Sequence, residues 1–191
     1  MPTWQIILIA AVVIVVVVVT VAAVVASSRR KSERLKQHFG AEYERTVSEA
    51  GDPKAAEKEL AGRARRRDKL DIVALSPEAL ADFTNRWQRV QTGFVDDPGS
   101  AVGAADQLVT EVMRQRGYPI DDDFEQQAAD ISVDHPQIVE NYRAAHGIHL
   151  AQQRGDVGTE QQREAFVHYR ALFEKLLDTT TDNDMAKEAR A

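Results

Sequence analysis

An unbroken apolar run near the amino terminus constrains this chain more than any other feature. Between Ile6 and Ala26 the only polar residue is Thr20, and the first 27 residues carry no charged side chain. A helix of these 21 residues would be about 32 Å long, which matches a hydrocarbon core of roughly 30 Å. The sequence therefore predicts a single transmembrane anchor over residues 1–28.

The charges that follow the run predict its orientation. Five basic residues lie within ten residues of the membrane exit, against the single acidic residue Glu33. These five are Arg29, Arg30, Lys31, Arg34 and Lys36. The positive-inside rule then places the amino terminus outside and the body in the cytoplasm, as in a single-pass protein of a cell inner membrane. The same residues would meet anionic headgroups of the lipid bilayer.

A cleaved signal peptide is the alternative interpretation, because Val24, Val25 and Ala26 before Ser27 loosely resemble a small-residue cleavage site. The body would then be extracytoplasmic or secreted. An uncleaved anchor is favoured, since the amino-terminal flank has no basic side chain and the apolar run is longer than a signal-peptide core.

The remaining chain is electrically polar. Residues 28–67 hold 12 basic and 7 acidic side chains, a net +5, whereas residues 68–191 hold 12 and 23, a net −11. A second basic cluster consists of Arg63, Arg65, Arg66, Arg67 and Lys69. We expect it to form a solvated helix face, with contact to lipid or nucleic acid as the alternative. For the whole chain no nucleic-acid partner is expected.

Helical periodicity and helix-start signals predict an all-α fold. Leu35, Phe39, Tyr43 and Val47 form one apolar stripe on a helix that ends near Gly51. The predicted starts of later helices are Asp52 with Pro53, Ser76 with Pro77, Asp97 with Pro98, Asp122 with Asp123, Asp134 with Pro136, and a capping box of Thr159 with Gln162. The first of these helices is expected to run to about Asp71.

These elements suggest four parts. After the anchor come basic juxtamembrane helices over residues 29–74, arranged as a stalk or hairpin. A compact helical bundle over residues 75–178 holds nine of the twelve aromatic residues and can bury a real core. Residues 179–191 are polar and charged, and we expect a disordered tail.

Few features point to catalysis. The chain has no cysteine, which excludes disulfides, thiolate metal sites and cysteine nucleophiles, and it lacks glycine-rich phosphate motifs. The most site-like stretch is residues 130–149, where His135, Glu140, His146 and His149 could ligate a metal. Gly147 suggests that a helix ends between the last two histidines. No cofactor is expected.

Six segments of the chain carry a resemblance to a known family. They are Trp87 to Pro98, Ala101 to Ala105, Leu108 to Met113, Arg116 to Pro119, Ser132 to Pro136 and Val139 to His146. They resemble a family of bacterial, actinobacterial-like membrane or secreted proteins of unknown function, over roughly residues 30–178. The resemblance implies a bacterial envelope setting and no particular activity.

The leading hypothesis is a non-enzymatic, membrane-anchored helical protein that acts as an interaction or scaffold module and binds a partner protein. The expected partner surface is the turn that holds Trp87, Phe94, Asp96 and Asp97. The alternative is a metal-dependent enzyme or sensor that uses the histidine stretch.

Overall fold

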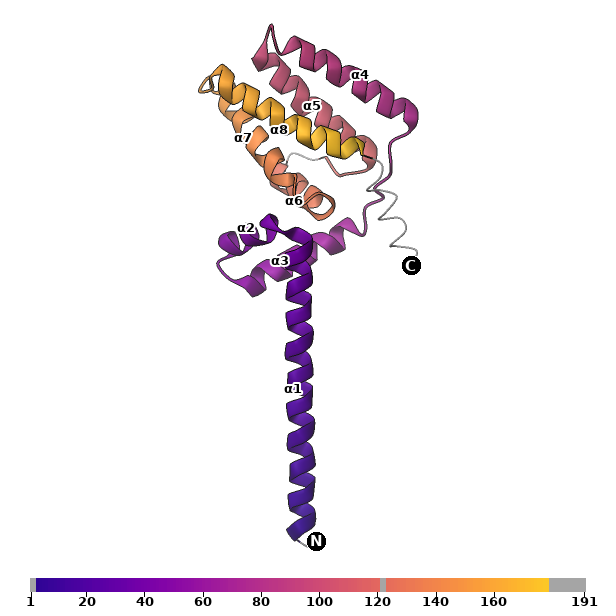
Figure 1. Cartoon of the computed structure of the whole chain (residues 1–191), viewed down its shortest axis with the longest axis vertical. Coiled ribbons are helices and arrows are strands. Elements are labelled where there is room, and N and C mark those ends of the chain that lie inside the picture. Colours follow the sequence, from indigo (N-terminus) through magenta and orange to yellow (C-terminus); the bar gives the residue numbers. More distant parts are fainter. Residues whose placement is uncertain (1–2, 121–122, 179–191) are drawn as a thin grey trace.

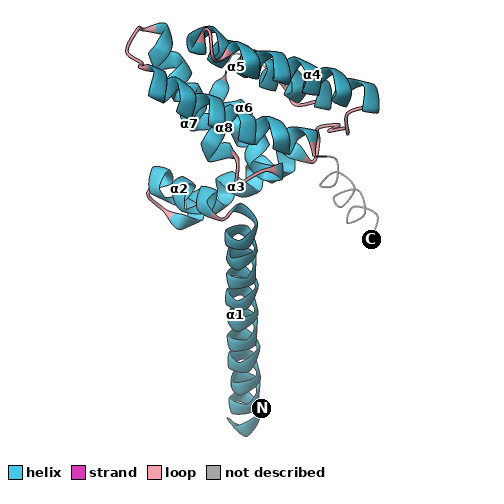
Figure 2. Cartoon of the chain, turned by 45° about the horizontal axis from the view of Figure 1, so that its top comes forward, coloured by secondary structure: helices cyan, strands magenta, loops and turns pink. Residues whose placement is uncertain are grey.

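The computed structural model describes residues 3–120 and 123–178, with the side chains of residues 3–14 and 24 left out (Figure 1). Within this part all regular structure is helical, which confirms the all-α prediction (Figure 2). The helices are α1 (Thr3–Phe39), α2 (Ala41–Ala50), α3 (Pro53–Arg67), α4 (Pro77–Gly93), α5 (Pro98–Arg116), α6 (Phe124–Asp134), α7 (Val139–Gln153) and α8 (Thr159–Leu177). The predicted tail, residues 179–191, lies outside the described residues.

Four of the predicted helix starts are confirmed by their caps. The side chains of Asp52, Ser76, Asp97 and Asp123 each accept a hydrogen bond from the backbone N–H three residues later. In the first three, proline occupies the first helical position, where its missing N–H removes no hydrogen bond. Local chemistry alone therefore specifies where α3, α4, α5 and α6 begin.

Two boundaries among the first three helices differ from the prediction. The stripe from Leu35 to Val47 is not one helix, because Gly40 adopts φ 51° and separates α1 from α2. This break turns α2 so that Phe39 and Tyr43 both reach Leu60 of α3. Helix α3 ends at Arg67 rather than Asp71.

Two later helices start at other residues than predicted. Asp134 is the last residue of α6, where its carboxylate binds Arg67 instead of capping α7, which begins at Val139. The cap of α8 is Gly158, whose N–H donates to the side chain of Gln161, one residue before the predicted pair.

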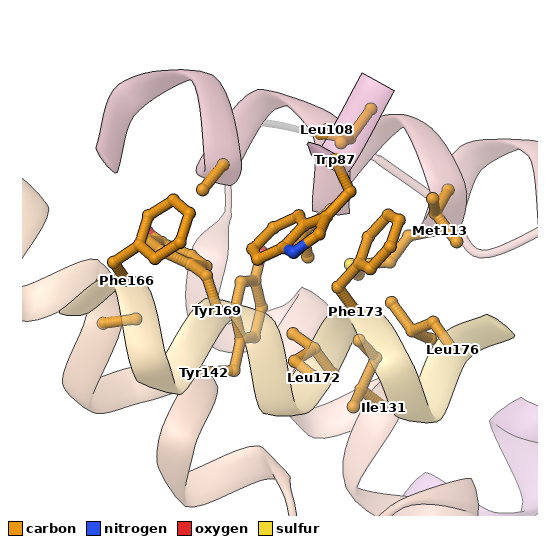
Figure 3. Close-up of a cluster of buried hydrophobic side chains, with 14 of the residues drawn as sticks. Trp87, Leu108, Met113, Ile131, Tyr142, Phe166, Tyr169, Leu172, Phe173 and Leu176 are labelled. Atoms are coloured by element: carbon orange, nitrogen blue, oxygen red, sulfur yellow. The ribbon is translucent and has the colours of Figure 1, made fainter. Parts of the chain in front are cut away.

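The bundle core lies between α4, α5, α7 and α8. The Trp87 ring of α4 packs between Phe166 and Phe173 of α8, with centroids 5.1 and 4.6 Å apart (Figure 3). Tyr142, Leu172 and other fully buried side chains complete this cluster. These aromatic residues of α4 and α8 are therefore part of the core.

A second, smaller core joins the first three helices to the bundle. Phe39, Tyr43 and Leu60 pack with Val133 of α6, and Leu35, Val47 and Ala64 cover them. Helices α2 and α3 consequently lie between the end of α1 and the bundle, and α1 projects away from both as a rod (Figures 1 and 2).

No helix that is both long enough and apolar enough to cross a membrane is found among the described residues. The first part of the run from Ile6 to Ala26 has side chains outside that set.

Gly117 provides a test of this packing. It ends α5 with φ 98°, and a Cβ at this position would collide with the carbonyl oxygen of Asp71. We expect Gly117→Ala to lower the free energy of unfolding by at least about 2 kcal/mol in urea titration. Gly62→Ala is the control, because a Cβ there meets nothing within 4 Å, and it should raise stability by about 0.5–1 kcal/mol. Equal effects of the two substitutions would contradict the close contact between Gly117 and the backbone of Asp71.

Candidate functional site

The described side chains of α1 between Val15 and Ala26 are apolar, apart from Thr20, and exposed. Val15 to Val19, Val21 and Val25 are 45–60% exposed, and Ser32, Leu35 and Phe39 contact the body near the carboxyl end of α1. The one polar residue of the run is satisfied internally, since Thr20 Oγ1 donates to the Val16 carbonyl at 2.7 Å. A water-facing helix does not ordinarily expose apolar side chains in this way.

The basic residues predicted to flank the anchor lie on the same continuous helix. Arg29, Arg30, Lys31, Arg34 and Lys36 are all exposed. Lys36 lies over the Tyr43 ring at 5.4 Å, and the other four make no ion pair or hydrogen bond within the described part of the chain. Their charges are thus available to solvent or to lipid headgroups.

A buried ion-pair network connects helices α2 and α3, which we call the neck, to the bundle. Glu42 of α2 is 2% exposed, and its carboxylate accepts from Arg143 of α7 at 2.7 and 2.9 Å and from Arg63 of α3 at 2.6 Å. Burial opposes ionisation of Glu42, but the two guanidinium groups hold its pKa below its ordinary value. Three helices therefore share one buried carboxylate.

Two further pairs continue the same interface between α3 and α6. Arg66 donates to Asp130 at 2.8 Å, and Arg67 donates to both oxygens of Asp134 at 2.7 and 2.9 Å. The hydroxyl of Tyr118 also donates to Asp134. Burial and this carboxylate raise the pKa of Tyr118, which keeps the hydroxyl protonated as a donor.

The expectation of a solvated face is therefore wrong for two of the five residues of the second basic cluster. Arg63 and Arg67 are largely buried, because Glu42 of α2 pairs with Arg63 and Asp134 of α6 pairs with Arg67. One signal could have indicated this: Ala56, Leu60, Arg63 and Arg67 share one helical stripe, so the apolar face of α3 continues directly into the two arginines.

Removing the shared carboxylate tests the network. Glu42→Gln removes the buried counter-charge that Arg63 and Arg143 share, so we expect the free energy of unfolding to fall by about 3–5 kcal/mol. Glu49→Gln is the matched control, since Glu49 is half exposed and pairs only with Arg45, and it should cost under about 1 kcal/mol. Urea denaturation measures both, and a small loss for Glu42→Gln would contradict the network.

The four candidate metal ligands do not form one site. His146 and His149 lie together on α7 with ring centroids 6.5 Å apart, because the helix continues through Gly147, contrary to expectation. Glu140 is exposed, and His135 lies at the end of α6. The described residues contain no group of three or more His, Cys, Asp or Glu side chains that could hold a metal.

Each of the two α7 histidines has another role in packing. His146 stacks on Phe124 with centroids 3.7 Å apart, and its Nδ1 lies 3.8 Å from Asp106 of α5. His149 packs beside Gly103 and shares a contact of 3.0 Å with Gln153.

Asp106 is a residue that the sequence reasoning missed. It accepts from the Tyr169 hydroxyl at 2.7 Å and lies beside His146. Although burial opposes its ionisation, these neighbours hold its pKa below its ordinary value. Gly99, Gly103 and Asp106 recur on the face of α5 that meets α7, and this spacing is the only signal that could have indicated the contact.

His135 is buried with neither ring nitrogen bonded to any described group. Burial, aided by the nearby Arg116, lowers its pKa to about 4. The unfolded chain takes up this proton near pH 6.5, and the folded chain only near pH 4. Stability should therefore fall as pH decreases through this window, by roughly 3 kcal/mol for this group.

The variant His135→Leu isolates that contribution. In urea denaturation at several pH values, the stability of the variant relative to wild type should rise between pH 6.5 and pH 4. A constant difference across this range would show that His135 does not titrate as its burial requires.

The structure separates the residues of the expected partner surface. Trp87 is in the core, and Phe94 is half-buried against Phe166 with centroids 4.9 Å apart. Asp97 caps α5. Asp96 and Asp97 are exposed, next to Val95, which is 83% exposed. The aromatic residues of this turn thus serve packing, and its tip is the exposed part.

Comparison with known proteins finds no matching family model, no matching curated protein and no matching solved structure. The resemblance to a bacterial family therefore stays a prediction.

Proposed function

We propose that this protein is a membrane-anchored interaction protein. In this proposal the run from Ile6 to Ala26 anchors α1 in a bilayer, the basic residues of α1 lie at the headgroups, and the bundle binds a partner protein. The proposed role is non-enzymatic, and the proposed partner surface is the acidic body beyond the neck.

The exposed valine surface of α1 carries this proposal. Five consecutive valines, Val15 to Val19, point in successive directions about 100° apart and so cover the whole circumference. A groove on a partner would bury one stripe and leave the rest in water. Lipid is the environment that covers all sides of such a helix at once.

Charge supports the proposed orientation. The five basic residues follow the apolar run within the same helix, with Glu33 as the only acidic residue among them. By the positive-inside rule, we infer an outer amino terminus and a cytoplasmic body at a bacterial inner membrane.

The body supports a protein partner more than a lipid or nucleic-acid one. Residues 68–191 carry a net charge of −11, which would repel phosphate-rich surfaces and attract a basic protein surface. The exposed tip with Val95 and Asp96 combines one apolar and one acidic side chain at the end of the bundle far from the rod (Figure 1).

Cysteine labelling tests anchor and orientation together, because the natural chain has no cysteine. We expect Thr3→Cys to react with an impermeant maleimide on intact cells, and Arg154→Cys to react only after permeabilisation. The full-length protein should also stay in the membrane fraction through alkaline carbonate extraction.

Each outcome tests a different part of the proposal. Release by carbonate would contradict the anchor, whereas labelling of Arg154→Cys on intact cells would contradict the cytoplasmic body. As a control, Val73→Lys and Val167→Lys add charge to exposed valines of the body and should leave membrane retention unchanged, while Val16→Lys with Val18→Lys should reduce it.

A further inference from the structure

The basic residues of helix α3 form two groups, one paired with acidic side chains and one unpaired in the described part of the chain. Arg63, Arg66 and Arg67 are paired with acidic side chains of α2, α3 or α6. The others are Lys54, Lys58 and Arg65, with Lys69 in the turn after the helix. These four are exposed and make no ion pair within the described residues. We name them the outer stripe of α3.

Helix geometry places the outer stripe opposite the bundle. At 100° per residue the four positions fall within about 60° of one another. The buried positions Ala56, Leu60, Arg63 and Arg67 fall about 180° away, and these face α2 and α6. The outer stripe therefore points away from the bundle.

The rod of α1 also extends away from the bundle. Both views show α3 across the upper end of α1, with the bundle on the far side (Figures 1 and 2). The outer stripe and the exposed valines of α1 are thus on the same side of the molecule.

One contact determines where α3 lies along the axis of α1. Ser32 Oγ of α1 donates to Glu57 of α3, and Tyr43 donates to the same carboxylate. Ser32 is six residues beyond Ala26, which is about 9 Å along a helix. The headgroup layer on each side of a bilayer is about 5–7 Å thick. Long basic side chains that point down from α3 reach this layer.

We propose that the outer stripe of α3 is a second membrane-contact site, which binds anionic lipid headgroups and holds the body against the bilayer. The proposal rests on the proposed anchor. Anionic headgroups are the proposed ligand because their charge is complementary to that of the outer stripe. The outer stripe also continues the basic residues of α1, since both sets face the same layer.

A fluorescent probe on α3 tests the proposal in the full-length chain. Ala61 lies between Lys58 and Arg65 at the edge of the outer stripe, so Ala61→Cys carries the probe and keeps all four basic residues. The protein is reconstituted into vesicles that contain a headgroup-spin-labelled lipid as quencher. We expect quenching to rise by at least about twofold when about 30% phosphatidylglycerol replaces phosphatidylcholine.

Two controls define the result. The combined variant Lys54→Gln, Lys58→Gln, Arg65→Gln and Lys69→Gln should abolish the rise. Four matched substitutions on the bundle, Arg89→Gln, Arg114→Gln, Arg154→Gln and Arg170→Gln, should preserve it, because these exposed residues lie outside α3. The same probe at Gln88→Cys of α4 should show no dependence on phosphatidylglycerol.

Failure of the α3 contact can be distinguished from failure of the anchor. A protein that resists carbonate extraction but shows equal quenching in both lipids would overturn the α3 contact and leave the anchor standing. A protein that carbonate extracts would overturn both proposals. Loss of binding to a labelled DNA duplex in the four-residue α3 variant, without any lipid dependence, would assign the stripe to nucleic acid instead.

Discussion

The arrangement of this molecule depends on one buried carboxylate. Glu42 accepts hydrogen bonds from Arg63 and Arg143, and so joins α2, α3 and α7 at a point from which water is excluded. A buried charge is tolerated only with partners in good geometry, so the three helices have little freedom to move independently. The neck is therefore packed onto the bundle.

The proposed orientation of α3 toward the membrane depends on this attachment. Because α3 is fixed to α6 through Arg66 and Arg67, its remaining basic side chains must point to the other side. Because Ser32 and Leu35 fix α3 near the start of the body, that side lies next to the proposed headgroup layer. In this proposal the same helix uses one set of arginines to bind the bundle and another set of charges to face lipid.

Much of the fold could be predicted from sequence, because helix starts depend on neighbouring residues. Asp52, Ser76 and Asp97 with their prolines are local signals, and each is confirmed. The charged interface could not be predicted in this way, since Arg66 and Arg67 meet carboxylates 64 and 67 residues away. Spacing along one helix indicates a shared face, but the partner of that face is a tertiary property. For the same reason, proximity in sequence suggests one group for the four candidate metal ligands, whereas the structure brings His146 and His149 together without Glu140 and His135.

The most direct test of the account is a distance measurement between neck and bundle in a membrane. Spin labels at Ser48→Cys of α2 and Gln88→Cys of α4 occupy exposed positions on the two parts. Pulsed electron paramagnetic resonance on the full-length protein in lipid nanodiscs should give one narrow distance distribution, and Glu42→Gln should broaden it. A broad distribution in the unaltered protein would contradict a neck held rigidly by its buried ion pairs.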